Sequence, residues 1–150
     1  MHTVKHLKDS SSQPLQKKPS QIGIKSYIPA MLLASLLGTY LDLYYVGKEL
    51  YDFPIRPLPS IFTINIGFTL LVLPITMILL LKIMQRCKSW LRVLLVLFIS
   101  LAMAVMEKVA EDLGLFVHAD DWNHLNTFVG YCVFIGLVYA FHGWVKRERE

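Results

Sequence analysis

The stretch that decides the fold is IFTINIGFTLLVLPITMILLL, residues 61–81, which contains no charged side chain. Its 21 residues would form a helix roughly 31 Å long, about the thickness of the hydrocarbon layer of a bilayer. Ser60, immediately before it, is a natural N-cap, and Pro74 in its middle predicts a kink. The stretch therefore predicts a transmembrane helix.

Three further segments resemble this run in length and hydropathy. They cover about residues 27–46, 90–113 and 121–145, and with it they make the chain 55% hydrophobic, with a mean hydropathy of +0.48. A soluble bundle would alternate apolar and polar positions along such segments. Gly114, followed by Leu115, predicts a glycine helix stop, and Asp120 or Asp121 is a good N-cap for the last segment. We predict an all-α integral membrane bundle of four transmembrane helices.

Lys and Arg residues divide unequally between the two sides of this bundle. Twelve lie in the N-terminal tail, around the second connection and at the C-terminus, whereas Lys48, Arg56 and Lys108 fall on the other side. Because basic connections remain in the cytoplasm, both termini are predicted to be cytoplasmic. Residues 1–26 then form a disordered basic tail, and residues 146–150 a short second one. The first apolar segment would serve as targeting signal and anchor.

Composition also bounds the partners. The sequence pI is about 9.1, but the basic residues flank apolar segments and form no aromatic-interleaved surface, so no nucleic-acid binding is predicted. The predicted partner is the lipid bilayer. Gly136, Ala140 and Gly143 form a small-residue stripe that suits packing within the bundle, or against a homo-oligomeric or other membrane-protein partner. Cys87 and Cys132 are interpreted as free thiols.

Asp42 is the most informative single residue, because it lies about one turn inside the outer end of the first helix. A carboxylate there faces low dielectric and the negative end of the helix dipole, so it needs a proton or a partner. The outer cations Lys48, Arg56 and Lys108 are the predicted partners. Asn65 is predicted to hydrogen-bond towards Asp42 or the outer glutamates. Nearby tyrosines and Trp122 are interpreted as an interfacial aromatic belt.

A second group lies at the outer end of the third helix. Glu107 and Glu111 are four residues apart and stack on one face, where like charges repel unless a metal, a proton, Arg56 or water neutralises them. With His118 and His124 they provide ligand types for a divalent metal, although the spacing fits no strong metal motif. The alternative is a solvated loop with capped helices. Otherwise no cofactor is predicted.

Two blocks carry a resemblance to a known family: DLYYVGKELYDFPIRPLPSIFTINIGFTLLVLP, residues 42–74, and EKVAEDLGLFVHADDWNHLNTFVGY, residues 107–131. The chain is similar there to small, uncharacterised multi-pass membrane proteins of endospore-forming Gram-positive bacteria. The resemblance implies a bacterial plasma membrane and brings no activity with it.

Three function classes follow from these features. The first is a non-catalytic membrane component, such as an accessory protein or a sensor of the envelope environment. The second is a small oligomeric transporter or a proton- or cation-coupled permease, for which Asp42 is the best support. The third is a metal-dependent membrane enzyme using Glu107, Glu111, His118 and His124. The sequence favours a non-enzymatic role, since it holds neither an H-E-x-x-H motif nor a visible Ser–His–Asp grouping.

Overall fold

The computed structural model describes residues 23–120 and 122–148. These residues form the helices α1 (Ile28–Gly47), α2 (Leu73–Arg86), α3 (Ser89–Asp112) and α4 (His124–Arg147). The π-helix η2 (Phe68–Val72) runs directly into α2, and the two make one spanning helix. Within the described residues, four helices are long and apolar enough to cross a membrane. The predicted all-α membrane bundle is confirmed, and the chain is a multi-pass membrane protein.

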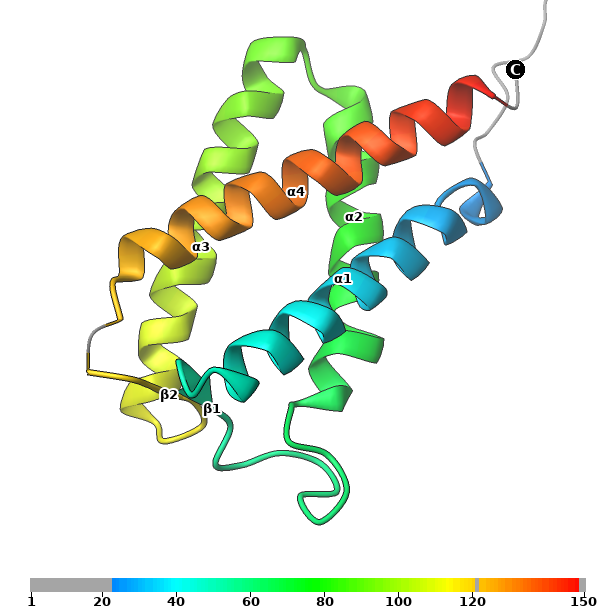
Figure 1. The fold of residues 1–150 in the computed structure, drawn as a ribbon. Helices are drawn as coiled ribbons and strands as arrows, with labels where there is room; N and C mark the ends of the chain where they lie inside the picture. The colour runs from blue at the N-terminus through cyan, green and yellow to red at the C-terminus, as the bar shows by residue number, and fades with distance from the viewer. Residues whose placement is uncertain (1–22, 121, 149–150) are drawn as a thin grey trace, which may run out of the picture.

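The helices form two crossed layers. α1 and α4 lie side by side and run across α2 and α3, which are joined by a short turn (Figure 1). α1 packs mainly on α2, and α4 packs on α3. The start of α1, the end of α4 and the α2–α3 turn meet at one end of the bundle, which we name the turn end. The other two connections meet at the opposite end, the clasp end.

Large apolar residues cover the surface of the bundle, whereas α1 contributes small residues to its core. Large apolar side chains face outward all round the bundle, for example Leu36 at 65% exposed and Phe98 at 67% exposed, as a surface in contact with lipid requires. Inside, Ala30, Ala34 and Gly38 are buried four residues apart along α1. Small side chains on one helix face let two helices approach closely. The core that packs around this face comprises Leu73, Met77, Leu80, Leu81 and Met84 of α2 with Ile135 and Val138 of α4.

The small-residue stripe noted in the sequence, on α4, lies outside the packed core, unlike the stripe on α1. A Cβ added at Gly136 or Gly143 would meet no described atom within 4 Å, and Ala140 is exposed. The prediction that this stripe packs within the bundle is therefore wrong. The buried stripe on α1 has that role instead.

The second spanning helix begins later than the apolar run. Ser60, predicted as its N-cap, is exposed in a turn, and residues 58–65 form a loop in which Leu58 has φ 51°. Helical structure starts at residues 66 and 67, where Asn65 Oδ1 accepts the N–H of Phe68 at 3.2 Å. Asn65 is thus the side chain that caps this helix, because it satisfies an otherwise free backbone donor. Apolar composition identified the segment but not its first residue.

The helix irregularity predicted at Pro74 takes the form of the π-helix directly before it. The N–H of Leu73 bonds to the carbonyl of Phe68, five residues back. Proline provides no N–H and crowds the carbonyl four residues before it, so the wider π turn accommodates it. Thr76 Oγ1 donates to the carbonyl of Val72 at 2.8 Å, and Thr69 Oγ1 donates to that of Ile66 at 3.4 Å.

The other helix ends test the remaining local predictions. Asn123 caps α4, its Oδ1 accepting the N–H of Leu125 at 2.9 Å. Asp120, the predicted cap, lies in a turn and is exposed, and Asp121 lies outside the described residues. Of the tail predicted to be disordered, Ile24–Ser26 forms a short 3-10 helix, and residues 1–22 lie outside the described residues.

The predicted glycine stop after α3 is confirmed. Gly114 has φ 72°, its N–H bonds to the carbonyl of Glu111, and the N–H of Leu115 bonds to that of Ala110, each at 2.9 Å. This pair of bonds is a Schellman motif, which satisfies carbonyls that the helix end leaves free. It turns the chain back towards the bundle.

We expect Gly114→Ala to destabilise the protein by about 1–2 kcal/mol, because an L side chain resists the left-handed backbone conformation. Denaturant titration of the purified protein in detergent measures the change. Gly143→Ala is the control, since that helical glycine has open space around it and alanine favours helix. Equal stability of the two variants would contradict the prediction.

Candidate functional site at the clasp end

The two connections at the clasp end are joined by a short antiparallel sheet. β1 (Tyr51–Asp52) pairs with β2 (Val117–His118), so that Tyr51 lies opposite His118. The N–H of Ala119 donates to the carbonyl of Leu50 at 2.9 Å and extends the pairing. We name this sheet the clasp. The sequence predicted that both connections share one side of the bundle; the structure adds that they bind each other.

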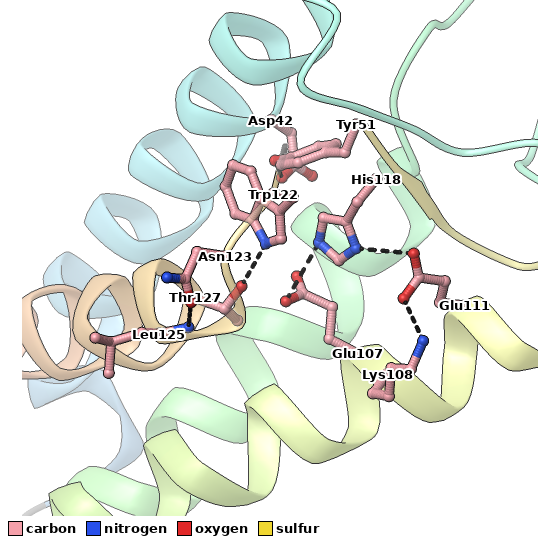
Figure 2. Close-up of polar contacts among 10 residues, drawn as sticks. All are labelled: Asp42, Tyr51, Glu107, Lys108, Glu111, His118, Trp122, Asn123, Leu125 and Thr127. Carbon is pink, nitrogen blue, oxygen red and sulfur yellow. Dashed lines mark hydrogen bonds and ion pairs between the residues drawn. The ribbon is translucent and has the colours of Figure 1, made fainter. Parts of the chain in front are cut away.

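Tyr51 connects the clasp to α1. Its hydroxyl donates to Asp42 Oδ1 at 2.6 Å, and the residue is only 9% exposed (Figure 2). Burial, followed by the adjacent Asp42 carboxylate, raises the pKa of Tyr51 well above its usual range. The phenol therefore keeps its proton and acts as a donor to Asp42.

The prediction that Asp42 pairs with an outer cation is wrong. Arg56 donates to the backbone carbonyls of Phe53 and Phe62 and lies 3.5 Å from Asp52. Lys108 contacts Glu111 at 3.1 Å and Asp112 at 3.5 Å. Lys48 is exposed just after the end of α1.

The amide of Asn65, the other predicted partner of Asp42, is used as the helix cap described above. Asp42 Oδ2 is buried and accepts no hydrogen bond from any described residue.

His118 lies between the two glutamates of α3 (Figure 2). Its Nδ1 is 3.4 Å from Glu111 Oε1, and its Nε2 is 3.6 Å from Glu107 Oε2. The side chain of His118 is 2% exposed, and those of Glu107 and Glu111 are 15% and 23% exposed. The like-charge pair that the sequence left unexplained is thus separated by an imidazole, and Lys108 holds the outer member.

The protonation state of His118 limits how many hydrogen bonds it can donate to the two glutamates. A neutral imidazole has one N–H, so it can donate to only one of the two glutamates. Burial lowers the pKa of His118 and favours this neutral form, although the neighbouring Glu111 opposes the shift. A separation of 3.6 Å is too long for a hydrogen bond. Glu107 Oε2 is consequently a second buried carboxylate oxygen without a hydrogen-bond partner among the described residues.

We expect the contribution of His118 to stability to fall as the pH drops below 6.5, the ordinary pKa of histidine. The unfolded chain then binds a proton that burial in the folded chain resists, so the loss continues down towards the lowered pKa. Thermal melting between about pH 7.5 and about pH 5 measures the profile. His118→Gln should flatten it. His124→Gln alters an exposed histidine and should not; equal slopes in all three proteins would contradict the assignment.

Aromatic rings surround His118 and form the interior of the clasp end. Trp122 stacks on the imidazole with ring centres 5.0 Å apart, and Phe116 meets it edge-on at 4.5 Å. Phe116 also packs on Tyr51 at 4.9 Å. The belt interpretation is wrong for the buried Tyr51. Tyr40 and Tyr44 are 72% and 54% exposed, and their place in an interfacial belt stays a prediction.

A signal for this cluster is present in the sequence and was missed. Tyr51 and Phe53 are two residues apart, as are Phe116 and His118. Residues at that spacing share one face of a strand. The two short alternations would have predicted the paired strands and the cluster of rings on one side of them.

Two cavities meet at the carboxylates. The smaller, about 130 Å³, lies towards α1 and α4 and is lined by Tyr45, Trp122 and Thr127 among others. The larger, about 440 Å³, extends between α2 and α3. The side chains that line both are Asp42, Tyr51, Phe68, Leu73, Glu107, Tyr131 and Phe134. The unpaired oxygens of Asp42 and Glu107 therefore belong to residues that line both cavities.

The predicted metal ligands do not assemble. His118 contacts both glutamates, whereas His124 meets it only as an edge-on ring, with centres 5.4 Å apart. Across residues 23–120 and 122–148, no three His, Cys, Asp or Glu side chains are placed to hold a metal ion. Elemental analysis of the purified protein tests the metal-dependent hypothesis directly.

A separate polar cluster lies at the turn end. His142 is 3% exposed, stacks on Tyr27 with ring centres 4.8 Å apart and contacts Gln85. The hydroxyl of Tyr27 donates to Gln85 at 2.8 Å. The sequence analysis did not predict this cluster, because its members come from three distant segments. It ties the start of α1 to the ends of α2 and α4.

Comparison of the chain with protein-family models, with curated proteins and with solved structures finds no match.

Proposed function

We propose that the protein is a non-catalytic component of a bacterial plasma membrane, an accessory or sensor protein of the envelope. In this proposal the clasp end faces outward and binds a ligand that carries a positive charge or several N–H donors. The observation that carries it is the pair of buried acceptors, Asp42 Oδ2 and Glu107 Oε2, which have no hydrogen-bond partner among the described residues and belong to side chains that line the same cavities.

A buried carboxylate oxygen without a donor is unfavourable by about 1–3 kcal/mol or more. Asp42 receives one hydrogen bond, from Tyr51, and Glu107 faces an imidazole nitrogen at 3.6 Å. A ligand with N–H donors would supply the missing partners and be held by charge-assisted hydrogen bonds. The side chains of His118 and Tyr51 already join the clasp to α3 and α1, which supports binding rather than catalysis at this site.

Binding is testable with a simple amine as the probe. The protein is placed in phosphatidylcholine vesicles with Trp90 and Trp144 changed to Phe, so that Trp122, in the wall of the smaller cavity, reports alone. n-Butylamine should change its fluorescence and raise the melting temperature, whereas n-butanol should do neither.

Asp42→Asn and Glu107→Gln should each weaken the response to n-butylamine about tenfold, the equivalent of one charge-assisted hydrogen bond. Asp112→Asn, on the exposed end of α3, is the matched control and should respond like the unaltered protein. Absence of any response, or an unchanged response in both pocket variants, would overturn the proposal.

The orientation is part of the proposal and rests on the twelve-to-three division of Lys and Arg. Cys87 lies in the α2–α3 turn at the turn end, and Ser60 lies in the loop at the clasp end. In intact cells, a membrane-impermeant maleimide should leave Cys132→Ser unlabelled and label Ser60→Cys in a cysteine-free background. The reverse labelling pattern would overturn the orientation.

A proton- or cation-coupled permease is the second candidate, favoured by Asp42 within a spanning helix with one oxygen unpaired among the described groups. Guanidinium added to proteoliposomes that contain the pH dye pyranine is a direct probe, because its permanent charge prevents passive entry. Proton movement that Asp42→Asn abolishes would support transport. No proton movement above that of empty liposomes would rule it out.

A further inference from the structure

The larger cavity has the shape of a slot between two helices. Its walls come from faces of α2 and α3 at three- and four-residue spacing, and include Thr76, Met77, Leu80, Ile99 and Met103. Phe68 and Leu80 mark its extent along the second helix, twelve residues apart, or roughly 18 Å. That length is more than half of a typical hydrocarbon layer. At about 440 Å³ it is within the size range of small-molecule sites.

The slot opens towards the sides of the bundle. Val72 and Met106 on its edges are 51% and 60% exposed, on a surface that faces lipid. Its inner wall is buried, with Met77 and Ile135 each 2% exposed. An apolar hollow of this kind does not hold water, and in a bilayer the molecules able to enter it are hydrocarbon chains.

The end of the slot nearest the clasp is polar, unlike the apolar remainder. Asp42 and Glu107 line it there, each with one buried oxygen that accepts no hydrogen bond from a described residue. Phe53 and Phe116 of the clasp end also line this part, and Phe116 is 6% exposed. We name Phe53 and Phe116 the aromatic roof, because they line the clasp side of the carboxylate end. The edges of the slot are exposed on the lipid-facing surface, so the slot offers a route from the bilayer.

We infer that the ligand of the proposed site is a membrane amphiphile whose head group bears a primary ammonium, held with its chain between α2 and α3 and its head against Asp42 and Glu107. This inference rests on the proposed function and names its ligand class. An ammonium provides three N–H donors and the opposite charge to the carboxylates. An anionic head without an amine would be repelled, and a short amine would leave the apolar slot unfilled.

The test is photo-crosslinking in phosphatidylcholine nanodiscs with two probes of equal chain length, dodecylamine and dodecanol, each with a diazirine near the chain end. The amine should crosslink about tenfold more than the alcohol, the equivalent of one charge-assisted hydrogen bond. Its adducts should map to peptides from α2 and α3 that line the slot. Equal labelling by both probes, or adducts spread evenly over the lipid-facing surface, would overturn the inference.

A matched pair of variants separates the slot from the general lipid surface. Thr76→Trp places a large side chain in the wall of the slot, and Leu79→Trp places the same side chain on the same helix at a residue that is 57% exposed to lipid. Thr76→Trp should abolish the preference for the amine, and Leu79→Trp should retain it. Loss in both, or in neither, would count against the slot.

Failure of this inference can be distinguished from failure of the proposed function. If n-butylamine acts on Trp122 through Asp42 and Glu107 but dodecylamine shows no preference, a soluble amine is the ligand and the amphiphile is excluded. If neither amine depends on the two carboxylates, the proposed function fails together with the inference.

Discussion

Gly38→Leu should destabilise the bundle by about 1–3 kcal/mol, the range for forcing extra volume into a packed core. A Cβ added at Gly38 would lie close to Cδ2 of Leu73, a residue that is itself only 8% exposed. The larger leucine side chain cannot be accommodated by movement of that methyl alone, so α1 must move away from the second helix. Titration with SDS of the protein in mixed micelles, followed by circular dichroism, measures the loss.

Gly136→Leu is the matched control, because a Cβ at that position meets no described atom within 4 Å. It introduces the same side chain into another spanning helix and should change stability by less than about 0.5 kcal/mol. A comparable loss in both variants would contradict the prediction. It would mean that the close approach of α1 to the second helix does not determine stability.

Tyr51→Phe should also lower the free energy of unfolding by about 1–3 kcal/mol, because it removes the one described donor to Asp42 while leaving the carboxylate buried. The same change at Tyr44, which is 54% exposed, should have little effect. The double variant Asp42→Leu, Tyr51→Phe should recover part of the loss, since it removes both hydrogen-bonding groups together. Additive losses in the double variant would show that the contact does not couple the clasp to α1.

The spanning helices follow from local properties of the sequence, which is why they could be predicted. Long apolar runs have few alternatives in a bilayer, because helices satisfy their own backbone hydrogen bonds. The stop at Gly114 is equally local, since glycine favours the left-handed conformation that a Schellman motif needs. The predicted helix starts were wrong. Asn65 and Asn123 serve as caps, whereas the sequence analysis assigned that role to Ser60 and Asp120.

The candidate site could be predicted only in part, because its contacts join distant segments. The sequence identified Asp42 from the cost of placing a carboxylate in apolar surroundings and Glu107 from its like-charge pairing with Glu111. The structure places both on the same cavities. It assigned cations to Asp42, whereas the observed donor is a tyrosine from the next connection. That choice depends on the register of the clasp, which nothing near Asp42 in the chain specifies.

The pairing of β1 with β2 has a consequence for the order of assembly. β2 follows α3, so β1 has no strand to pair with until the ribosome has delivered most of the chain. Independently stable helices can insert first and associate afterwards. Asp42 and Glu107 come from opposite halves of the chain, so the acceptor pair and the roof above it come together only in this last step. A truncated chain of one helical hairpin can therefore enter the membrane, but it has neither the complete acceptor pair nor the complete aromatic roof.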